Sequence, residues 1–430
     1  MKIFNNPNRG TWPELITRPA LELDFLESTV KNILNRVKLG GDAALKELTF
    51  QLDGAQLDNL LVSQSEIAAA KEALSVELKQ AIITAQRNIE VFHASQIKTE
   101  AIIETMPGVN CWRKAVAIDK VGIYIPGGTA PLFSTVLMLG TPAKLAGCKE
   151  VILCTPPDKN GKVNPAILFA ASLVGVTKIV KVGGAQAIAA LAYGTESVNK
   201  VYKIFGPGNQ YVTMAKQLVN QQGTAIDMPA GPSEVLVMAD ESAEAAFVAA
   251  DLLSQAEHGT DSQVMLVLLD KHKLKDIQEE VEKQLTLLPR KKIATQALEN
   301  SRVVQFDVLA QAIDFVNEYA PEHLIINLKN DEEVAAQITN AGSVFLGNYT
   351  PEAAGDYASG TNHTLPTSGY AKAYAGVSLD SFVKNITYQR ISKEGIQNIG
   401  PSIEQMADAE QLVAHKRAVS VRLEKLLTRK

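Results

Sequence analysis

The segment DLLSQAEHGTDSQ, residues 251–263, ends an apolar helical pattern with residue types that can bind a metal ion. Gln255 and His258 are three residues apart, so on a helix both side chains would leave the same face of the last turn. Gly259, however, is the residue type that commonly takes the left-handed position after a helix end, so the same letters also predict a simple C-terminal cap. The segment alone leaves both interpretations open.

Most of the six histidines lie beside polar residues that suit acid–base or metal chemistry, whereas His93 and His272 look like surface or helix-face residues without a role. The other candidates form pairs along the chain: Gln255 with His258, Glu322 with His323, Asp356 with His363, and Glu410 with His415. A single histidine is more often a packed or exposed side chain than a ligand, and the long separations argue against a local zinc-binding module. Spacing therefore supports only the hypothesis that the fold brings these groups to one metal ion.

Three glycine-rich turns, YIPGGTAP, VGGAQA and FGPGNQ, each follow an apolar run and open a helical pattern. Free backbone N–H groups at such helix starts can hold an anion or a dinucleotide. None of the turns matches G-x-G-x-x-G, and glycines that merely turn the chain are the simpler explanation for each turn alone. Together, at the carboxyl ends of neighbouring parallel strands, they would line one ligand-binding crevice.

The elements that must position these residues alternate between short apolar runs and helical periodicity from about residue 117 onward. The runs predicted as strands are 121–125, 150–157, 178–184, 201–208, 234–240, 263–270, 302–306, 323–328 and 342–347. They are almost entirely apolar, as expected for parallel strands covered by helices on both faces. The pattern predicts an α/β fold, with a Gly/Pro-rich junction or hinge in DMPAGPSEV, a mostly helical region before residue 117 and helices over the last fifty residues.

Composition narrows the class of protein. The 430 residues are 46% hydrophobic and 21% charged, which is typical of a soluble globular protein of two or three domains. A net charge of −5 without a Lys/Arg stripe gives no support for nucleic-acid binding. Residues 121–143 carry no charge, but Pro126 and Pro131 near their start argue against a membrane-spanning helix.

The N-terminal residues and the cysteines bear on the cellular compartment of the protein. The polar N-terminus lacks the apolar core of a signal peptide, so we expect a cytoplasmic protein that binds no membrane. Cys111, Cys148 and Cys154 are odd in number and have no CxxC spacing. They predict buried thiols in a reducing compartment rather than disulfides, with a catalytic cysteine as the less favoured alternative.

Taken together, the motifs resemble those of one family, histidinol dehydrogenase. The resemblance covers about residue 111 to the C-terminus and rests on VGIYIPGGTAPLFSTVLMLGTPAKLAGC, VGGAQAIAALAYGTESV, KIFGPGNQYVT, AIDMPAGPSEVLV, DLLSQAEHGTDSQV, APEHLII, AGSVFLG, PEAAGDYASGTNHTLPT and AHKRAV. These segments occur in the family's order, and no position expected to be functional departs from its pattern. The first hundred residues fit more loosely.

The resemblance implies an NAD-dependent enzyme that oxidises L-histidinol to L-histidine through an aldehyde, with one zinc ion per site. It implies Gln255, His258, Asp356 and His415 as zinc ligands. Glu322 and His323 would be the acid/base pair, since an imidazole titrates near neutrality and a carboxylate can activate water for the second oxidation.

The same resemblance assigns the binding residues. Tyr124, Gln186 and Asn209 would bind NAD, and they fall in the three glycine turns described above. The substrate would be contacted by Ser233, Gln255, His258, His323, Asp356, His363, Glu410 and His415. The missing dinucleotide fingerprint is then expected, because the family binds NAD on an incomplete Rossmann-like fold.

The implied architecture is α/β, with two doubly wound, incomplete-Rossmann-like domains that have parallel-rich sheets, plus small helical segments at both termini. We expect an N-terminal extension over 1–20, a catalytic domain from 21–120 with 233–376, an NAD-binding domain over 121–232, and a C-terminal helical segment over 377–430. The family resemblance also implies a homodimer in which this last segment crosses to the partner and completes its active site.

Two other functions fit the residues without the resemblance. One is a zinc hydrolase that uses Glu322 to activate water, with the glycine turns as purely structural features. The other is a metal-binding or scaffold protein without catalysis. Release of reduced nicotinamide from histidinol would discriminate the dehydrogenase from both.

Overall fold

The computed structural model describes residues 1–18, 23–127, 131–229 and 231–428, and the chain divides into two compact units. The larger unit consists of Met1–Gln96 and Ile118–Phe382, and the smaller of Ile97–Ala117 and Val383–Lys430. Residues 128–130 of the first glycine turn and position 230 of the predicted hinge lie outside the described residues. Within the described ranges, no helix has both the length and the apolar character that crossing a membrane requires.

One sheet of the larger unit has five parallel strands in the spatial order β6-β5-β4-β7-β8. Their bounds are β4 Lys120–Tyr124, β5 Glu150–Cys154, β6 Lys178–Val180, β7 Lys203–Phe205 and β8 Ala225–Ile226. Alternate residues of β5 serve two separate cores, with Ile152 and Cys154 on one face and Val151 and Leu153 on the other. Both faces are therefore buried, which explains the unbroken apolar runs in the sequence.

Helices cover both faces of this sheet. The first core contains α2 Leu23–Asp53, α7 Gly184–Tyr193 and α8 Gln210–Gln221, and the second contains α4 Val76–Ala94, α5 Phe133–Ala146 and α6 Pro165–Leu173, with α3 Gln64–Ala73 packed against α6. The expected grouping of residues 21–120 with 233–376 is wrong for these helices, because α2, α3 and α4 pack on the five-stranded sheet. Amphipathic helices bury an apolar stripe against any apolar sheet, so their sequences do not say which sheet they cover.

The second sheet has six parallel strands in the order β1-β11-β10-β9-β12-β13. Their bounds are β1 Lys2–Asn5, β9 Glu234–Ala239, β10 Gln263–Leu268, β11 Arg302–Gln305, β12 His323–Asn327 and β13 Ser343–Leu346. Residues 1–20 are thus more than an extension, since β1 forms an edge strand of this sheet. All nine strands expected between residues 121 and 347 are present, and the α/β fold with parallel-rich sheets is confirmed.

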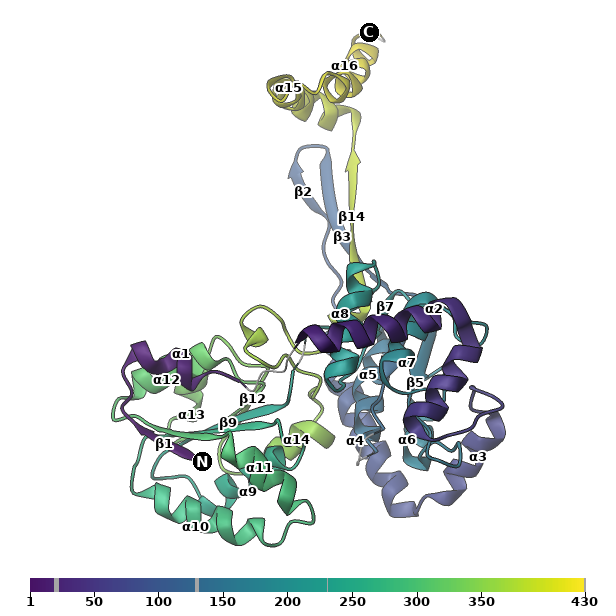
Figure 1. Ribbon diagram of the computed structural model, residues 1–430. Helices are drawn as coiled ribbons and strands as arrows, with labels where there is room; N and C mark the ends of the chain where they lie inside the picture. The colour runs from purple at the N-terminus through teal and green to yellow at the C-terminus, as the bar shows by residue number, and fades with distance from the viewer. Residues whose placement is uncertain (19–22, 128–130, 230, 429–430) are drawn as a thin grey trace. The chain divides into compact units, whose positions relative to one another are not determined.

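Figure 1 shows α9, α10 and α11 on one side of the six-stranded sheet and α1, α12 and α13 on the other. Their bounds are α1 Trp12–Leu15, α9 Ala245–Ala256, α10 Lys273–Leu285, α11 Lys291–Glu299, α12 Leu309–Tyr319 and α13 Asp331–Ala335. A further short helix, α14 Glu352–Tyr357, follows β13 and packs against α9. These two contacts, α14 with α9 and β12 with β9, bring the chemically active residues together.

The smaller unit combines an antiparallel sheet with a helical pair. Its strands are β2 Ile103–Met106, β3 Val109–Ala117 and β14 Val383–Ile391, and its helices α15 Lys393–Ala409 and α16 Val413–Leu427 pack on each other. The expectation of a purely helical segment over 377–430 is therefore wrong at β14. The β14 sequence VKNITYQRI is rich in β-branched and aromatic residues, which favour a strand.

Candidate active site

The acid/base candidates lie at the amino end of β12, in the middle of the six-stranded sheet. α12 ends at Tyr319, and the left-handed backbone of its C-cap Ala320 (φ 53°) turns the chain before Pro321. Glu322 is the residue just before the strand and His323 is its first residue, so the two side chains escape the strict alternation of a strand. Both are buried, with His323 Nδ1 3.7 Å from Glu322 Oε2.

Two further carboxylates from α14 surround the His323 imidazole. Glu352 Oε1 lies 3.6 Å from Nδ1, and Asp356 Oδ1 lies 3.4 Å from Nε2. Glu352 is fully buried, and its other oxygen accepts a hydrogen bond of 3.0 Å from Ser254. Glu352 was not among the residues predicted from the sequence, although its i, i+4 spacing from Asp356 would place both carboxylates on one face of a helix.

Burial and mutual attraction shift the pKa values of this cluster. Burial raises the pKa of Glu322 and of Glu352, because a carboxylate loses its hydration there. Burial alone would lower the pKa of His323, but the carboxylates of Glu322 and Glu352 outweigh it and raise the pKa above its usual value. Burial would raise the pKa of Asp356, yet the His323 imidazole lowers it overall. The site is therefore a coupled acid–base cluster in which protons are shared among close neighbours.

Gln255 lies in the last turn of α9 and is completely buried, and neither its Oε1 nor its Nε2 has a hydrogen-bond partner among the described residues. Leaving a buried amide unsatisfied costs free energy, so a polar partner for Gln255 would stabilise this region. The predicted cap is wrong in detail. α9 ends at Ala256 with Glu257 as right-handed C-cap, and Gly259 has no positive φ.

His258 follows this helix end and donates its backbone N–H to the Gln255 carbonyl over 3.2 Å. The side chain keeps exposed surface, but neighbouring protein atoms desolvate the imidazole enough to lower its pKa. Asp356 is close enough to oppose that shift, which places His258, Asp356 and the His323 cluster in one region. A neutral imidazole is the form that ligates metals.

His363 has both ring nitrogens engaged. Nδ1 lies 2.8 Å from the Asp356 carbonyl oxygen, and because a carbonyl only accepts, this nitrogen carries the proton. Nε2 lies 2.9 Å from the Thr135 hydroxyl on α5, which must then donate. Burial lowers the pKa of His363, which favours this neutral tautomer.

The last expected site residues are distributed over both units. Ser233 directly precedes β9 at the same edge of the sheet as Glu322. Glu410 and His415 belong to the smaller unit, where both are exposed. Among the described residues, no group of three or more His, Cys, Asp or Glu side chains is arranged to hold a metal ion. Three of the four expected ligands, Gln255, His258 and Asp356, lie in the larger unit. Gln255 is not a His, Cys, Asp or Glu, so these three ligands include only two side chains of the types just named.

The expected NAD residues lie at the carboxyl edge of the five-stranded sheet. Tyr124 ends β4, and its hydroxyl accepts a 3.1 Å hydrogen bond from the Gly184 N–H at the start of α7. Gln186 in the first turn of α7 is buried, and its Oε1 has no hydrogen-bond partner in the part of the chain that the structure describes. Asn209 is exposed and caps α8 by accepting from the N–H groups of Tyr211 and Val212. These side chains thus lie at the starts of α7 and α8.

The strand order explains why this edge is suited to a ligand. Strand order reverses at β4 and β7, and crevices at such switch points bind ligands in open α/β sheets. Gly206, with φ 127°, follows β7 where an added Cβ would collide with the Tyr124 carbonyl. Only glycine allows the two turns to approach so closely.

A buried acid–base cluster at one sheet and glycine turns at another define an α/β enzyme. A profile of the histidinol dehydrogenase family matches residues 16–423. A histidinol dehydrogenase from Bacteroides fragilis (strain YCH46) is 62% identical over 426 residues, which cover 99% of this chain and 100% of that protein. The chain belongs to the histidinol dehydrogenase family, an oxidoreductase family of histidine biosynthesis, and the resemblance is confirmed.

Solved structures agree with this assignment. The crystal structure of histidinol dehydrogenase from Elizabethkingia anophelis has a TM-score of 0.97 at 58% identity and covers 99% of this chain and 98% of that chain. An NAD-dependent aldehyde dehydrogenase from Sinorhizobium meliloti has a TM-score of 0.52 at 12% identity, covering 85% and 87% of the two chains. This second likeness concerns the fold alone.

Proposed function

We propose that this chain oxidises L-histidinol to L-histidine with two molecules of NAD, by way of the aldehyde. The observation that carries the proposal is the buried Glu322–His323 pair within a chain that matches histidinol dehydrogenases over its full length. The hydrolase alternative is not favoured, because the family consists of oxidoreductases.

In the first oxidation, His323 accepts the hydroxyl proton while the carbinol carbon transfers a hydride to the nicotinamide. A base must be neutral to do this, whereas the neighbouring carboxylates raise the pKa of His323. The ammonium group of histidinol, bound beside Asp356 and Glu352, would offset those negative charges and lower the pKa of His323 toward neutrality. Binding of histidinol would thus favour the neutral form of His323, which can act as the base.

In the second oxidation, water adds to the aldehyde carbon, and the resulting diol loses a hydride to a second NAD. Glu322 accepts a proton from the attacking water, and its raised pKa makes the carboxylate a stronger base. His323 takes the proton of the diol hydroxyl as the second hydride leaves. The product is the carboxylate of histidine. The first oxidation releases one proton and one reduced nicotinamide, and the second releases two protons and one reduced nicotinamide.

A metal ion fits the residues present. The buried amide of Gln255 without a partner, the neutral imidazole of His258 and the carboxylate of Asp356 are a suitable donor set. We propose that they hold one zinc ion together with His415 of a second copy of the chain. When bound, the ion would supply a Lewis acid that orients the substrate. His363 and Ser233, with Glu410 of the second copy, would bind the polar groups of the substrate.

We place NAD at the carboxyl edge of the five-stranded sheet. The helix starts beside Tyr124, Gln186 and Asn209 would receive its phosphates, and the Gln186 oxygen without a partner would accept a hydrogen bond from the cofactor. We also propose that the protein is cytoplasmic and forms a homodimer.

Titration with a limiting amount of histidinol tests the function. With excess NAD and zinc, two reduced nicotinamides should form per histidinol, followed by absorbance, with histidine as the product found by chromatography. One reduced nicotinamide per histidinol would contradict the second oxidation. Zinc bound without any reduction of NAD would overturn the proposal as a whole.

A further inference from the structure

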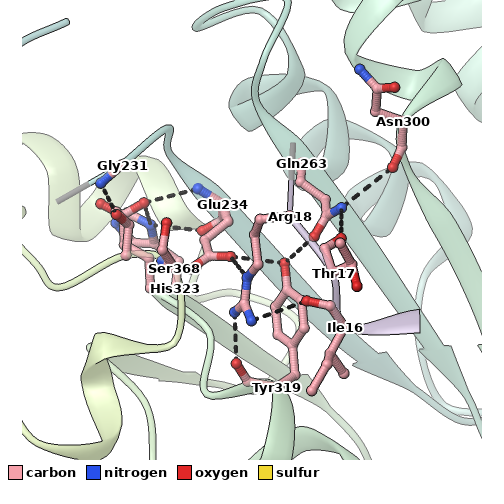
Figure 2. A network of polar contacts seen from close by, with 12 residues as sticks. Ile16, Thr17, Arg18, Gly231, Glu234, Gln263, Asn300, Tyr319, His323 and Ser368 are labelled. Carbon is pink, nitrogen blue, oxygen red and sulfur yellow. Dashed lines mark hydrogen bonds and ion pairs between the residues drawn. The ribbon is translucent and has the colours of Figure 1, made fainter. Parts of the chain in front are cut away.

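Glu234, the first residue of β9, is the centre of a buried polar network that no part of the proposed mechanism uses (Figure 2). Its Oε2 accepts from Arg18 Nε over 2.8 Å and lies 2.9 Å from the Tyr319 hydroxyl. Its Oε1 accepts from the backbone N–H of Ser368 over 2.6 Å. One carboxylate therefore ties together the N-terminal segment, α12 and the loop that follows His363.

The backbone of the same residue reaches the acid/base pair. The N–H of Glu234 donates to Glu322 Oε2 over 2.9 Å, and its carbonyl oxygen lies 3.4 Å from His323 Nδ1. A shift of the start of β9 would therefore move the hydrogen-bond donor of Glu322 directly. The side chain of Glu234 holds that start together with the pairing of β9 with β10 and β12.

Arg18 makes several further contacts within this network. Its Nη2 donates to the Tyr319 carbonyl over 2.6 Å, its Nη1 to the Ile16 carbonyl over 3.2 Å, and its guanidinium lies 3.8 Å from the Tyr319 ring centroid. The Arg18 side chain is 15% exposed and that of Glu234 only 1%. Removal of one partner from such a buried pair leaves an uncompensated charge, so each side chain depends on the other for its position.

We propose that Arg18 and Glu234 are positioning residues that hold the Glu322 carboxylate in its reactive place through the N–H group of Glu234. This inference rests on the proposed function, in which Glu322 activates water. The network also ties the described end of DMPAGPSEV, the segment predicted as a junction or hinge, to Arg18 and Ser368. The N-terminal segment thereby acts on the active site without touching the substrate.

Steady-state kinetics of the full-length protein test the proposal. Arg18→Met should lower kcat at least about tenfold while KM for histidinol changes less than about twofold, because Glu322 moves but no substrate contact is lost. Arg18→Lys keeps the charge and should recover part of kcat. Arg9→Met is the matched control, since Arg9 pairs with Asp314 and Glu318 on α12 but not with Glu234, and it should leave kcat unchanged.

Tyr319→Phe is a second variant that removes one donor to Glu234 without leaving a buried charge, in case Arg18→Met does not fold. It should also lower kcat, but in a Glu322→Gln background it should cause no further loss, because the residue through which it acts is already altered. A purely structural role would make the two losses multiply. Multiplying losses, or an unchanged kcat in folded Tyr319→Phe, would overturn the proposal.

A crystal structure of Tyr319→Phe separates this inference from the proposed function, because it needs no turnover. A distance from the Glu234 nitrogen to the Glu322 carboxylate beyond about 3.5 Å supports the inference, and an unchanged hydrogen bond overturns it. Failure of the wild-type protein to reduce NAD with histidinol would overturn the proposed function instead.

Discussion

At the scale of single residues, the main feature of the site is that several carboxylates surround one imidazole, that of His323. Glu322, Glu352 and Asp356 all lie within 3.7 Å of a His323 ring nitrogen. Desolvation and repulsion among like charges keep these acids from ionising independently, so the protonation state of His323 depends on all of them. Glu352 forms the closest carboxylate contact with Nδ1.

Glu352→Gln should shift the pH dependence of turnover. The carboxylates raise the pKa of His323, so removing one of them lowers that pKa and leaves the neutral base present at lower pH. We expect the acid limb of kcat/KM to move down by about one pH unit. The measurement is initial rate across the pH range, with the exposed Glu333→Gln on α13 as control. An acid limb that moved upward would contradict this account.

Individual residues of the candidate site could be predicted from the sequence, but their arrangement in space could not. Gln255 and His258 were identifiable from an i, i+3 pair, and the glycine turns from strand–turn–helix patterns. The approach of α14 to β12 depends on tertiary packing, which local spacing does not encode. Glu234 and Thr135 could not be identified from the sequence for the same reason, because the neighbours that give them a role are distant in the chain. Glu352 had one local signal, its i, i+4 spacing from Asp356.

At the scale of elements, apolar runs predicted every central strand of both sheets, because a strand buried on two faces has no polar alternation. The strands that escaped prediction, β1, β2, β3, β8 and β14, lie at a sheet edge or in the small unit. Their exposed faces carry polar residues, and several are only two to four residues long. Pairing with a neighbour determines such strands more than composition does.

The end of α2 provides a test of element stability. Asp53 is the last residue of α2, and its Oδ2 is buried without a hydrogen-bond partner among the residues described. Its negative charge lies at the negative end of the helix dipole. Burial raises its pKa to about 6. The folded state therefore holds a proton that the unfolded state releases near pH 4, and stability is lost as the pH rises from about 4 to about 6.

Asp53→Asn should stabilise the protein by on the order of 1–2 kcal/mol at pH 8, because the amide has no ionised form to desolvate. Denaturant unfolding of both proteins at pH 8 and pH 5 would measure this, and the gain should be smaller at pH 5. Asp58→Asn, on an exposed carboxylate in the following loop, is the control. An equal gain at both pH values would show that ionisation of Asp53 is not the cause.

At the scale of the whole molecule, the two sheets share one strand order. β6-β5-β4-β7-β8 and β11-β10-β9-β12-β13 both run third, second, first, fourth, fifth along the chain. The candidate residues nevertheless occupy different edges, with Tyr124 at the carboxyl end of β4 and His323 at the amino end of β12. A shared topology therefore did not dictate a shared site, as expected when function depends on side chains rather than on the fold.

Glu410 and His415 belong to a separate unit and are exposed there, although the family resemblance makes them part of an active site. If a second copy supplies them, Gln255→Ala and His415→Ala chains should each be inactive alone, because each lacks one ligand in every site. A heterodimer of the two would contain one site with both defects and one site with neither. Mixing the unfolded chains and refolding them together should therefore restore up to half of the wild-type activity per heterodimer, with one zinc bound per heterodimer by elemental analysis. Refolded mixtures that form heterodimers but regain neither activity nor zinc would show that each chain builds its site alone.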